Sequence, residues 1–296
     1  MRTTALIVTH NRLEKLKKCW GTTSPIKFDN IIIVNNSSTD GTGLWLEQLD
    51  DDRLIIINSI ENTGGAGGFK MGAEYIKAHI STDWIFIYDD DAYPDKNILD
   101  EFEKVDKTGY VALSSRVVDP AGVDCKMNMP FKTLPLTLYQ NIQYMFMPER
   151  FLPESGISSD CMTLSFVGAI VRYDIFVKSI DYIHDKLFIY YDDVFYSYHL
   201  VLNGYKFKYT PNLLFTHDIP ATSCSDVPPW KKYYLTRNLL LSRKLFGSST
   251  PYSCFSIFLR LIKLSFSCLA NKRKYESLCF MLEGIFDGLK GKNGKR

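Results

Sequence analysis

The segment Trp84-Ile-Phe-Ile-Tyr-Asp-Asp-Asp-Ala92 joins an apolar run to three consecutive carboxylates. Its aromatic and β-branched residues are typical of a buried strand. Alternate residues of an extended chain share a face, so Asp89 and Asp91 can converge on one cation while Asp90 points elsewhere. Oxygen ligands of this kind suit Mg²⁺ or Mn²⁺, and these ions in turn suit a diphosphate. The alternative for the triplet alone is a solvated acidic turn.

Strand and helix patterns alternate over residues 1–115, on both sides of this segment. We expect strands at 3–9, 31–34, 54–58, 84–88 and 111–115, and helices after Asn11 as N-cap and over 44–49 and 69–79. Strands spaced by amphipathic helices predict a mostly parallel α/β sheet with right-handed crossovers. Ligands of such sheets bind beyond the carboxyl ends of the strands. Four polar segments fall at that edge, namely residues 9–12, 35–40, 61–69 and 89–91.

A glycine-rich segment, Glu61-Asn-Thr-Gly-Gly-Ala-Gly-Gly-Phe69, follows the third predicted strand. It has neither the Gly-Lys-Ser/Thr of a Walker phosphate loop nor the Gly-x-Gly-x-x-Gly spacing of a dinucleotide fold. Glycines remove side chains where a backbone approaches a ligand, and the helix N-terminus beyond them favours anions. We therefore expect a loop that faces a ligand, with a flexible linker as the alternative.

A second acidic motif lies in the other half of the chain. After an irregular region over 116–160 and an expected strand over 164–171, the aromatic run that begins at Lys186 ends in Asp192 and Asp193. A carboxylate at such a strand-to-helix junction can act as a general base. The pair can equally be an N-cap followed by an acid of the first helical turn.

Two further polar residues follow in the same half. His217 ends an apolar strand and could offer a neutral nitrogen to the metal of Asp91, or it could be a structural histidine. Residues 230–238 have helical spacing, which would bring Tyr234, Arg237 and Asn238 near one face. Arg237 could then clamp a phosphate, or it could be an ordinary exposed arginine.

Composition sets wide bounds on the class of protein. Of the 296 residues 46% are apolar, which fits one large domain or one domain with an extension. The seven cysteines include no Cys-x-x-Cys pair, so neither a zinc knuckle nor a dithiol redox motif is indicated. Their odd number and the lack of a secretory signal fit a reducing cytosol. Basic residues cluster at the C-terminal tail rather than along the sheet, which argues against nucleic-acid binding.

The C-terminal segment bears on location. The apolar run Pro251–Ala270 is interrupted by Arg260 and Lys263, which makes it too polar for an easy transmembrane helix. Basic residues follow at 271–274 and at 290–296, so the pattern predicts a helix at a membrane surface. The alternatives are a helix packed on the rest of the protein and a contact in a homodimer.

Taken in order, these motifs resemble family 2 glycosyltransferases. The resemblance rests on the segments 8–12, 34–41, 61–69 and 89–91, and it covers about residues 3–240. The glycine-rich segment, Tyr191–Asp193, His217 and the Arg237-Asn238 pair look most like the galactofuranosyl- and rhamnosyltransferase branch. An Asp common in the second loop of this family is Asn35 or Asn36 here, so contact with uracil or thymine is expected to differ.

The family implies a fold and a division of the chain. We expect a GT-A fold, which is a Rossmann-like, mostly parallel α/β sheet flanked by helices. The glycosyltransferase domain would span 1–245, with a nucleotide-sugar half over 1–115 and an acceptor half over 116–245. Residues 246–296 would form a helical, basic extension that can associate with a membrane.

The family also implies roles for single residues. Asp89, Asp91 and His217 would hold the metal, and Asp193 would be the general base. The expected nucleotide-sugar site comprises Thr9, Arg12, Asn36, Asn62, Gly64, Gly65, Gly67, Gly68, Phe69, Asp90 and Arg237. The expected acceptor site comprises Gly168, Tyr191, Asp192 and Trp230.

The implied activity is an inverting transfer that depends on Mn²⁺ or Mg²⁺. The favoured donor is UDP-galactofuranose, because Tyr191–Asp193 occurs together with His217, and the alternative donor is dTDP-rhamnose. The implied acceptor is a lipid-linked glycan of bacterial O-antigen or capsule synthesis, which would place the enzyme in the cytoplasm, at the inner face of the cytoplasmic membrane. An alternative of another class is a non-catalytic module that binds a nucleotide-sugar or a glycan and needs neither Asp193 nor His217.

Overall fold

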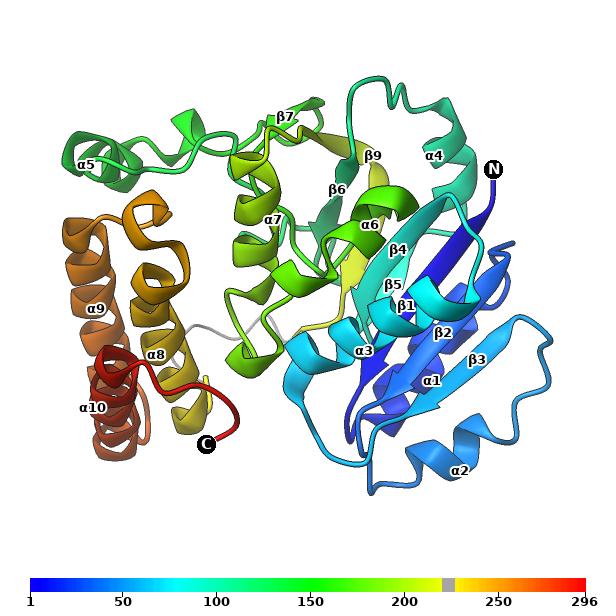
Figure 1. The fold of residues 1–296 in the computed structure, drawn as a ribbon, viewed down its shortest axis with the longest axis horizontal. Helices are drawn as coiled ribbons and strands as arrows, with labels where there is room; N and C mark the ends of the chain where they lie inside the picture. Colours follow the sequence, from blue (N-terminus) through cyan, green and yellow to red (C-terminus); the bar gives the residue numbers. More distant parts are fainter. Residues whose placement is uncertain (220–226) are drawn as a thin grey trace.

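A nine-stranded sheet with helices on both faces forms the centre of the computed structural model, which describes residues 1–219 and 227–296 (Figure 1). The strands are β1 (Thr3–Thr9), β2 (Asn30–Asn35), β3 (Leu54–Asn58), β4 (Trp84–Asp89), β5 (Ala92–Pro94), β6 (Ala112–Val118), β7 (Ser159–Cys161), β8 (Ala169–Arg172) and β9 (Phe207–His217). The helices are α1 (Leu13–Thr23), α2 (Thr42–Leu46), α3 (Gly64–His79), α4 (Ile98–Lys104), α5 (Leu138–Phe146), α6 (Tyr173–Lys178), α7 (Asp192–Leu202), α8 (Pro229–Phe246), α9 (Cys254–Leu269) and α10 (Lys274–Lys290).

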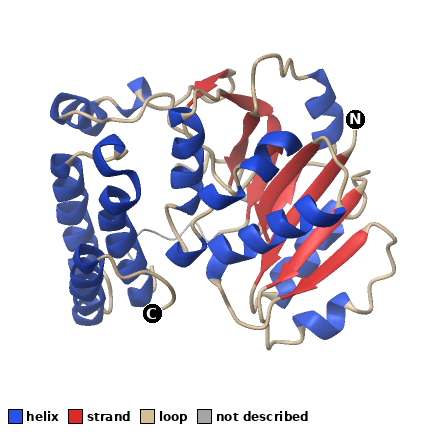
Figure 2. Cartoon of the chain, in the orientation of Figure 1, coloured by secondary structure: helices blue, strands red, loops and turns tan. Residues whose placement is uncertain are grey.

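The strand order is β3-β2-β1-β4-β8-β6-β9-β5, with β7 paired to β9. Strands β5, β7 and β8 are antiparallel to their neighbours, and the other strands run in one direction. Helices cover the two faces and gather again at one end of the molecule, where α8, α9 and α10 lie together (Figure 2). The predicted α/β class, the mostly parallel sheet and the C-terminal helical part are therefore confirmed.

The core consists of two layers because successive strand residues point to opposite faces of the sheet. On one face Leu6 and Val8 of β1 pack with Phe69 and Ile76 of α3. On the other face their neighbours in β1 pack against α1 and α4, with Leu16 and Phe102 among the contacts. The sheet is thus buried on both sides, as its continuous apolar runs predict.

Most element predictions in the first half are confirmed to within a few residues. Strands β1 and β3 have the predicted bounds, and β2, β4 and β6 differ slightly at their ends. The predicted cap is wrong, because Arg12 rather than Asn11 precedes α1 and neither side chain caps it. The carboxylate of Asp40, from the next loop, accepts the Leu13 N–H at 2.9 Å instead. A cap supplied by a distant loop leaves no local signal in the sequence.

The prediction for the glycine-rich segment is wrong. Residues 64–68 form the first turns of α3, and not a loop in front of it. A Cβ on Gly64 would lie 2.0 Å from the Phe188 carbonyl oxygen, one on Gly67 2.4 Å from Thr63, and one on Gly68 2.5 Å from Val8. These glycines allow the helix to pack closely on the sheet and on the chain around Phe188. Only Gly65 has open space where a side chain would be.

Two predicted strands of the second half are shorter or absent. The expected strand over 164–171 is reduced to β8, and the aromatic run before Asp192 is not a strand. It forms a 3₁₀ turn (Asp185–Leu187) and then bends through positive φ values at Phe188, Tyr190 and Tyr191. The Asn238 side chain donates to the carbonyls of residues 187, 189 and 190, which satisfies backbone groups that a sheet would otherwise pair. The region 116–160, predicted to be irregular, also contains α5.

The C-terminal helices pack on one another and on α8. The predicted basic tail lies on this group, because the Arg296 N–H donates to the Tyr234 hydroxyl and the Arg296 guanidinium pairs with Glu283 at 2.8 Å. Within the segments that the structure describes, no helix combines the length and the apolar character that crossing a membrane requires. The cysteines of these segments are free thiols, and Cys224 lies outside them.

Replacing Gly64 by Ala should lower the free energy of unfolding by about 2–4 kcal/mol, since a positive φ and an overlap with the Phe188 carbonyl act together. Urea denaturation of the purified variant measures this loss. The matched control is Gly65→Ala, one residue along, where the change should be neutral or stabilising by about 0.5–1 kcal/mol. Equal stability of the two variants would contradict the packing role of Gly64.

Candidate active site

The carboxyl ends of β1, β2 and β4 bring the predicted polar segments to one edge of the sheet. Val8 of β1 lies opposite Asp89 of β4, so the loop after β1 reaches the acidic triplet. Strand β5 follows the triplet directly and pairs with β9, with Ala92 opposite His217. This register places His217 beside Asp91 although the two are far apart in the sequence.

Thr9 and Arg12 hold the acidic triplet in place. The Thr9 hydroxyl donates to Asp90 at 2.8 Å. The Arg12 guanidinium pairs with Asp91 at 2.7 Å and with Asp90 at 3.2 Å, while 46% of its side chain stays exposed. Both residues were predicted to line a nucleotide site. In the structure their side chains contact the carboxylates of Asp90 and Asp91.

The acids carry more negative charge than these contacts offset. Burial raises the pKa of Asp89 well above its usual value, and the charges of Asp91, Asp90 and Asp192 raise it further. Burial also raises the pKa of Asp90 to about 6, against the opposing charge of Arg12. Burial disfavours the charged form of Asp91 too, but the hydrogen bond from His217 and the charge of Arg12 lower its pKa overall. A bound cation would relieve the remaining repulsion.

The donor set suits a divalent metal such as Mn²⁺ or Mg²⁺. His217 Nε2 lies 3.4 Å from Asp91 Oδ1, and His217 Nδ1 lies 3.0 Å from Asn128 Oδ1. A second hydrogen bond of this kind orients metal-binding histidines and leaves the other ring nitrogen for the ion. Over residues 1–219 and 227–296, however, no three His, Cys, Asp or Glu side chains are arranged to hold a metal. The structure thus brings Asp91 and His217 together and does not form the full predicted set with Asp89.

Several residues predicted to bind the nucleotide-sugar have structural roles. Asn36 is buried, and its amide accepts from Thr63 and donates to the Gly64 carbonyl at 2.8 Å. Asn62 accepts the Gly64 N–H at 2.8 Å, and the Phe188 carbonyl accepts the Ala66 N–H at 3.2 Å. The Gly64 and Ala66 N–H groups at the α3 N-terminus are therefore used within the protein. Phe69, Gly67 and Gly68 lie in the core.

The second acidic motif begins α7. Tyr191 precedes this helix with a φ of 67°, Asp192 is buried and Asp193 is half-buried. Burial raises the pKa of Asp193 to about 6, while hydrogen bonds from the backbone of Val194 and Phe166 act in the opposite direction. Because the charge of Asp192 raises the pKa of Asp89, the two acidic motifs lie within electrostatic reach of each other.

The remaining acceptor-site predictions differ in their placement. Trp230 is 40% exposed at the start of α8, where a ligand could reach it. Gly168 is buried at a φ of 86°, and a Cβ there would lie 2.9 Å from the Phe215 ring. Its lack of a side chain allows close packing against Phe215 of β9.

The structure does not support the predicted phosphate clamp of Arg237. This side chain is fully buried, and its guanidinium donates to the carbonyls of Leu187 at 2.8 Å and Lys186 at 3.3 Å, and also to that of Gly294. Its position on α8 therefore joins the segment before α7 to the C-terminal tail. Helical spacing alone does not reveal that the face bearing Arg237 points inward.

Lys231 lies near the acidic edge and was not predicted there from the sequence. It lies on α8 with its ammonium 5.9 Å from the centre of the Tyr190 ring. Burial and the charge of Arg12 lower its pKa, whereas the charges of Asp91 and Asp89 raise it. Lys231 thus faces the acidic edge that Arg237 does not reach. The adjacent Lys232 donates to Ser267 instead, a difference that no sequence pattern predicts.

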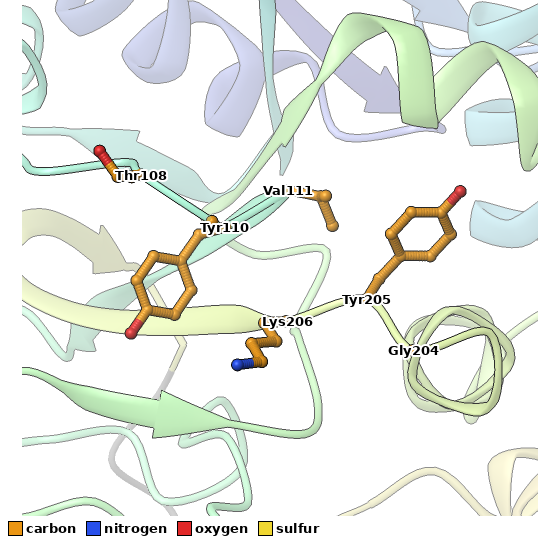
Figure 3. Close-up of a pocket in the computed structure, with 7 residues that line it drawn as sticks. Thr108, Tyr110, Val111, Gly204, Tyr205 and Lys206 are labelled. Carbon is orange, nitrogen blue, oxygen red and sulfur yellow. The ribbon is translucent and has the colours of Figure 1, made fainter.

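A pocket of about 250 Å³ lies at the opposite edge of the sheet and has no part in this site (Figure 3). It is lined by Thr108, Gly109, Tyr110, Val111, Gly204, Tyr205 and Lys206. These residues precede β6 and β9, which run parallel to β4, so the pocket is at their amino ends. The acids are at the carboxyl ends.

Replacing Arg237 by Met should lower the free energy of unfolding by about 2–5 kcal/mol, because buried carbonyls lose their donor. Thermal unfolding followed by circular dichroism measures the change. Arg243→Met, on an exposed position of the same helix, is the control and should unfold near the wild-type temperature. A normal melting temperature for the Arg237 variant would contradict the structural role.

Comparison with solved structures identifies the same fold elsewhere. S. aureus TarS 1-349 has a TM-score of 0.53 and 14% identity, covering 99% of this chain and 92% of that one. The mannosyltransferase PcManGT from Pyrobaculum calidifontis, in complex with GDP-Man and Mn²⁺, has a TM-score of 0.51 and 13% identity, covering 94% and 73%. GalNAc-T7 with UDP, GalNAc and Mn²⁺ has a TM-score of 0.56 and 14% identity, covering 97% of this chain but 57% of that one. At these identities the likeness concerns the fold.

Sequence comparison gives the family. No curated protein matches the chain in sequence. A family profile described as "Glycosyl transferase family 2" matches residues 4–177, which include β1 to β4, the acidic triplet and β8. The profile covers more than half of the chain. The chain therefore belongs to glycosyl transferase family 2, and it is a glycosyltransferase with a GT-A fold.

Proposed function

We propose that this glycosyltransferase transfers a sugar, with inversion, from a nucleoside diphosphate donor to a glycan acceptor. The observation that carries the proposal is the approach of two acidic motifs, since the charge of Asp192 acts on Asp89. One motif suits the leaving group and the other suits the attacking hydroxyl. The favoured donor is UDP-galactofuranose and the alternative is dTDP-rhamnose, on the strength of Tyr191–Asp193 occurring with His217.

The leaving group would bind at the acidic edge. Asp89, Asp91 and His217 would hold Mn²⁺ or Mg²⁺, which supplies positive charge to a departing diphosphate when it is bound. Two solved structures of this fold contain Mn²⁺ together with a nucleotide, which supports the choice of ion. Lys231 and the exposed part of Arg12 would offset further negative charge on the diphosphate, in place of Arg237.

Asp193 would act as the general base toward the acceptor. Its ionised carboxylate would take the proton from an acceptor hydroxyl while that oxygen attacks the anomeric carbon, opposite the diphosphate. Desolvation keeps the pKa of Asp193 near 6, which makes it a stronger base than an exposed aspartate and still leaves it ionised at neutral pH. Single displacement of this kind inverts the anomeric centre.

Replacing Asp193 by Asn should lower kcat by about 10²–10⁴-fold and leave the Kd for UDP with Mn²⁺ nearly unchanged. The assay is acceptor-dependent release of nucleoside diphosphate, run with UDP-galactofuranose and with dTDP-rhamnose. Asp181→Asn, an exposed position outside the site, is the control and should retain activity. Wild-type kcat should rise with pH through about 6 as Asp193 ionises.

Three outcomes would count against this reading of Asp193. Substantial transfer by the Asn variant would contradict the base assignment. Retention of the donor's anomeric configuration in the product would contradict single displacement. Binding of the nucleotide-sugar without release of nucleoside diphosphate from any donor and glycan tested would favour the non-catalytic binding module.

We further propose that the C-terminal helices bring the enzyme to an anionic membrane that carries a lipid-linked acceptor. One side of α9 packs inward through Ile257 and Cys268. Its other side exposes an apolar stripe made of Phe255, Phe258, Ile262, Phe266 and Leu269. Stripes of the same kind lie on the adjoining helices, with Leu138, Tyr139, Ile142, Met145 and Phe146 on α5 and Tyr275, Leu282, Phe286 and Leu289 on α10.

The charge beside these stripes favours a lipid surface over a neutral protein partner. Lys263 is exposed on α9, and exposed Lys272, Arg273 and Lys274 join α9 to α10. Apolar side chains with basic neighbours are the pattern of interfacial helices, and each basic group adds about 1 kcal/mol near anionic lipid. Exposed apolar side chains gathered on three adjoining helices are typical of an interaction surface.

Replacing Phe258 and Phe266 together by Asp should reduce binding to vesicles of phosphatidylglycerol and phosphatidylcholine by at least about tenfold. The reason is that two exposed aromatic side chains, which would enter the lipid, are lost. Co-sedimentation measures the bound fraction. The control is Leu44→Asp, an exposed apolar position on α2 that should bind like the wild type. Wild-type binding by the double variant, or self-association in place of vesicle binding, would contradict the membrane role.

A further inference from the structure

A cation from the C-terminal extension lies near a tyrosine that contacts the segment of the proposed base. Arg260 is on α9, and its guanidinium is 4.6 Å from the centre of the Tyr252 ring. The Arg260 Nε is buried, and no hydrogen-bond partner for it exists among the described residues. Among the described residues, no carboxylate forms an ion pair with Arg260. Carboxylates do form ion pairs with Arg12, Arg53, Arg116, Arg172, Arg273 and Arg296.

Tyrosines connect this cation to the second acidic motif. The Tyr252 ring lies 6.0 Å from that of Tyr191, the residue directly before Asp192 and Asp193. Burial raises the pKa of Tyr252, and while the charge of Arg260 opposes this effect, the charge of Asp193 adds to it. Arg260 and Asp193 therefore both lie within electrostatic reach of one phenol.

A third tyrosine, from α5, lies near the same guanidinium. Burial raises the pKa of Tyr144, and the charge of Arg260 opposes the shift. Helices α5 and α9 adjoin at this end of the molecule, where their exposed apolar stripes also lie (Figure 1). Arg260 thus lies among tyrosine side chains, on the helix that also carries an exposed apolar stripe.

An oxyanion is the ligand class that this environment fits best. The Nε of the half-buried Arg260 is sealed, but its guanidinium has no carboxylate partner among the described residues, so its terminal NH₂ groups can donate to a phosphate. The acidic edge already has Lys231 and Arg12 for the diphosphate of a donor. A third cation, Arg260, near the segment of Asp193, is therefore available for a different molecule, which is the acceptor.

We propose that Arg260 binds a phosphate group of the acceptor and so positions the hydroxyl beside Asp193. This inference rests on the proposed function for the meaning of "acceptor". The phosphate could belong to the lipid that carries the glycan or to the glycan itself. In either case the substrate class is an anionic, phosphate-bearing acceptor, which a neutral glycan would replace only poorly.

The test is binding of octyl phosphate and of inorganic phosphate, measured by isothermal titration on the full chain. Replacing Arg260 by Met should weaken octyl phosphate binding by at least about tenfold, since a charge-assisted hydrogen bond is lost. Arg260→Lys keeps the charge and should lose less, and it covers the case in which the Met variant fails to fold. Lys77→Met, at an exposed position on α3 outside the proposed sites, is the control and should bind like the wild type.

The arms of the experiment separate the possible outcomes. Tighter binding of octyl phosphate than of inorganic phosphate supports a lipid-borne phosphate, and equal binding supports a phosphate on the glycan. Unchanged binding in Arg260→Met, or an equal loss in Lys77→Met, would overturn the proposal. A loss that appears only in Lys231→Met would mean that phosphate binds at the acidic edge, and this too would overturn it.

Failure of the Arg260 inference and failure of the proposed function would give different results. Phosphate binding that depends on Arg260, in a protein that transfers no sugar, would refute the proposed function and leave an anion site. Transfer that proceeds with an unchanged acceptor KM in Arg260→Met would refute this inference and leave the function standing.

Discussion

Repulsion among the carboxylates at the end of β4 governs how the sheet edge is built. Thr9 and Arg12 reach Asp90 and Asp91 because β1 pairs directly with β4. His217 reaches Asp91 because β5, which follows Asp91 directly, pairs antiparallel with β9 and places Ala92 opposite His217. These contacts do not balance the negative charge, since burial and the neighbouring acids still hold the pKa of Asp89 well above its usual range. A divalent cation with a diphosphate would supply what is missing.

The second acidic motif depends on helices that follow it in the chain. Arg237 and Asn238 of α8 hold the carbonyls of the segment before α7, so the chain turns through Tyr191 with Asp193 in the first turn of the helix. The same helix presents Lys231 to the acids. Because one helix serves both motifs, α8 is an integral component of the site.

The sequence predicted the fold class and most of the first half, because buried parallel strands have continuous apolar runs and their ends are polar. It also predicted that His217 would meet Asp91, which the β5–β9 pairing explains. It could not predict that Gly64 and its neighbours serve packing, since a glycine leaves the same signal for a close contact and for a ligand. Helical spacing does not show which side of a helix faces the core. Arg237 was therefore expected to reach a ligand, whereas it is buried and Lys231 lies near the acids.

We propose that a metal and a nucleoside diphosphate bind at Asp89, Asp91 and His217. The most direct test is a crystal structure of the protein with UDP and Mn²⁺, using the anomalous scattering of manganese to locate the ion. The account predicts an anomalous peak next to Asp91 and His217, with the diphosphate of UDP on the ion. Ordered UDP at another edge of the sheet, or at this edge without a manganese peak, would contradict it.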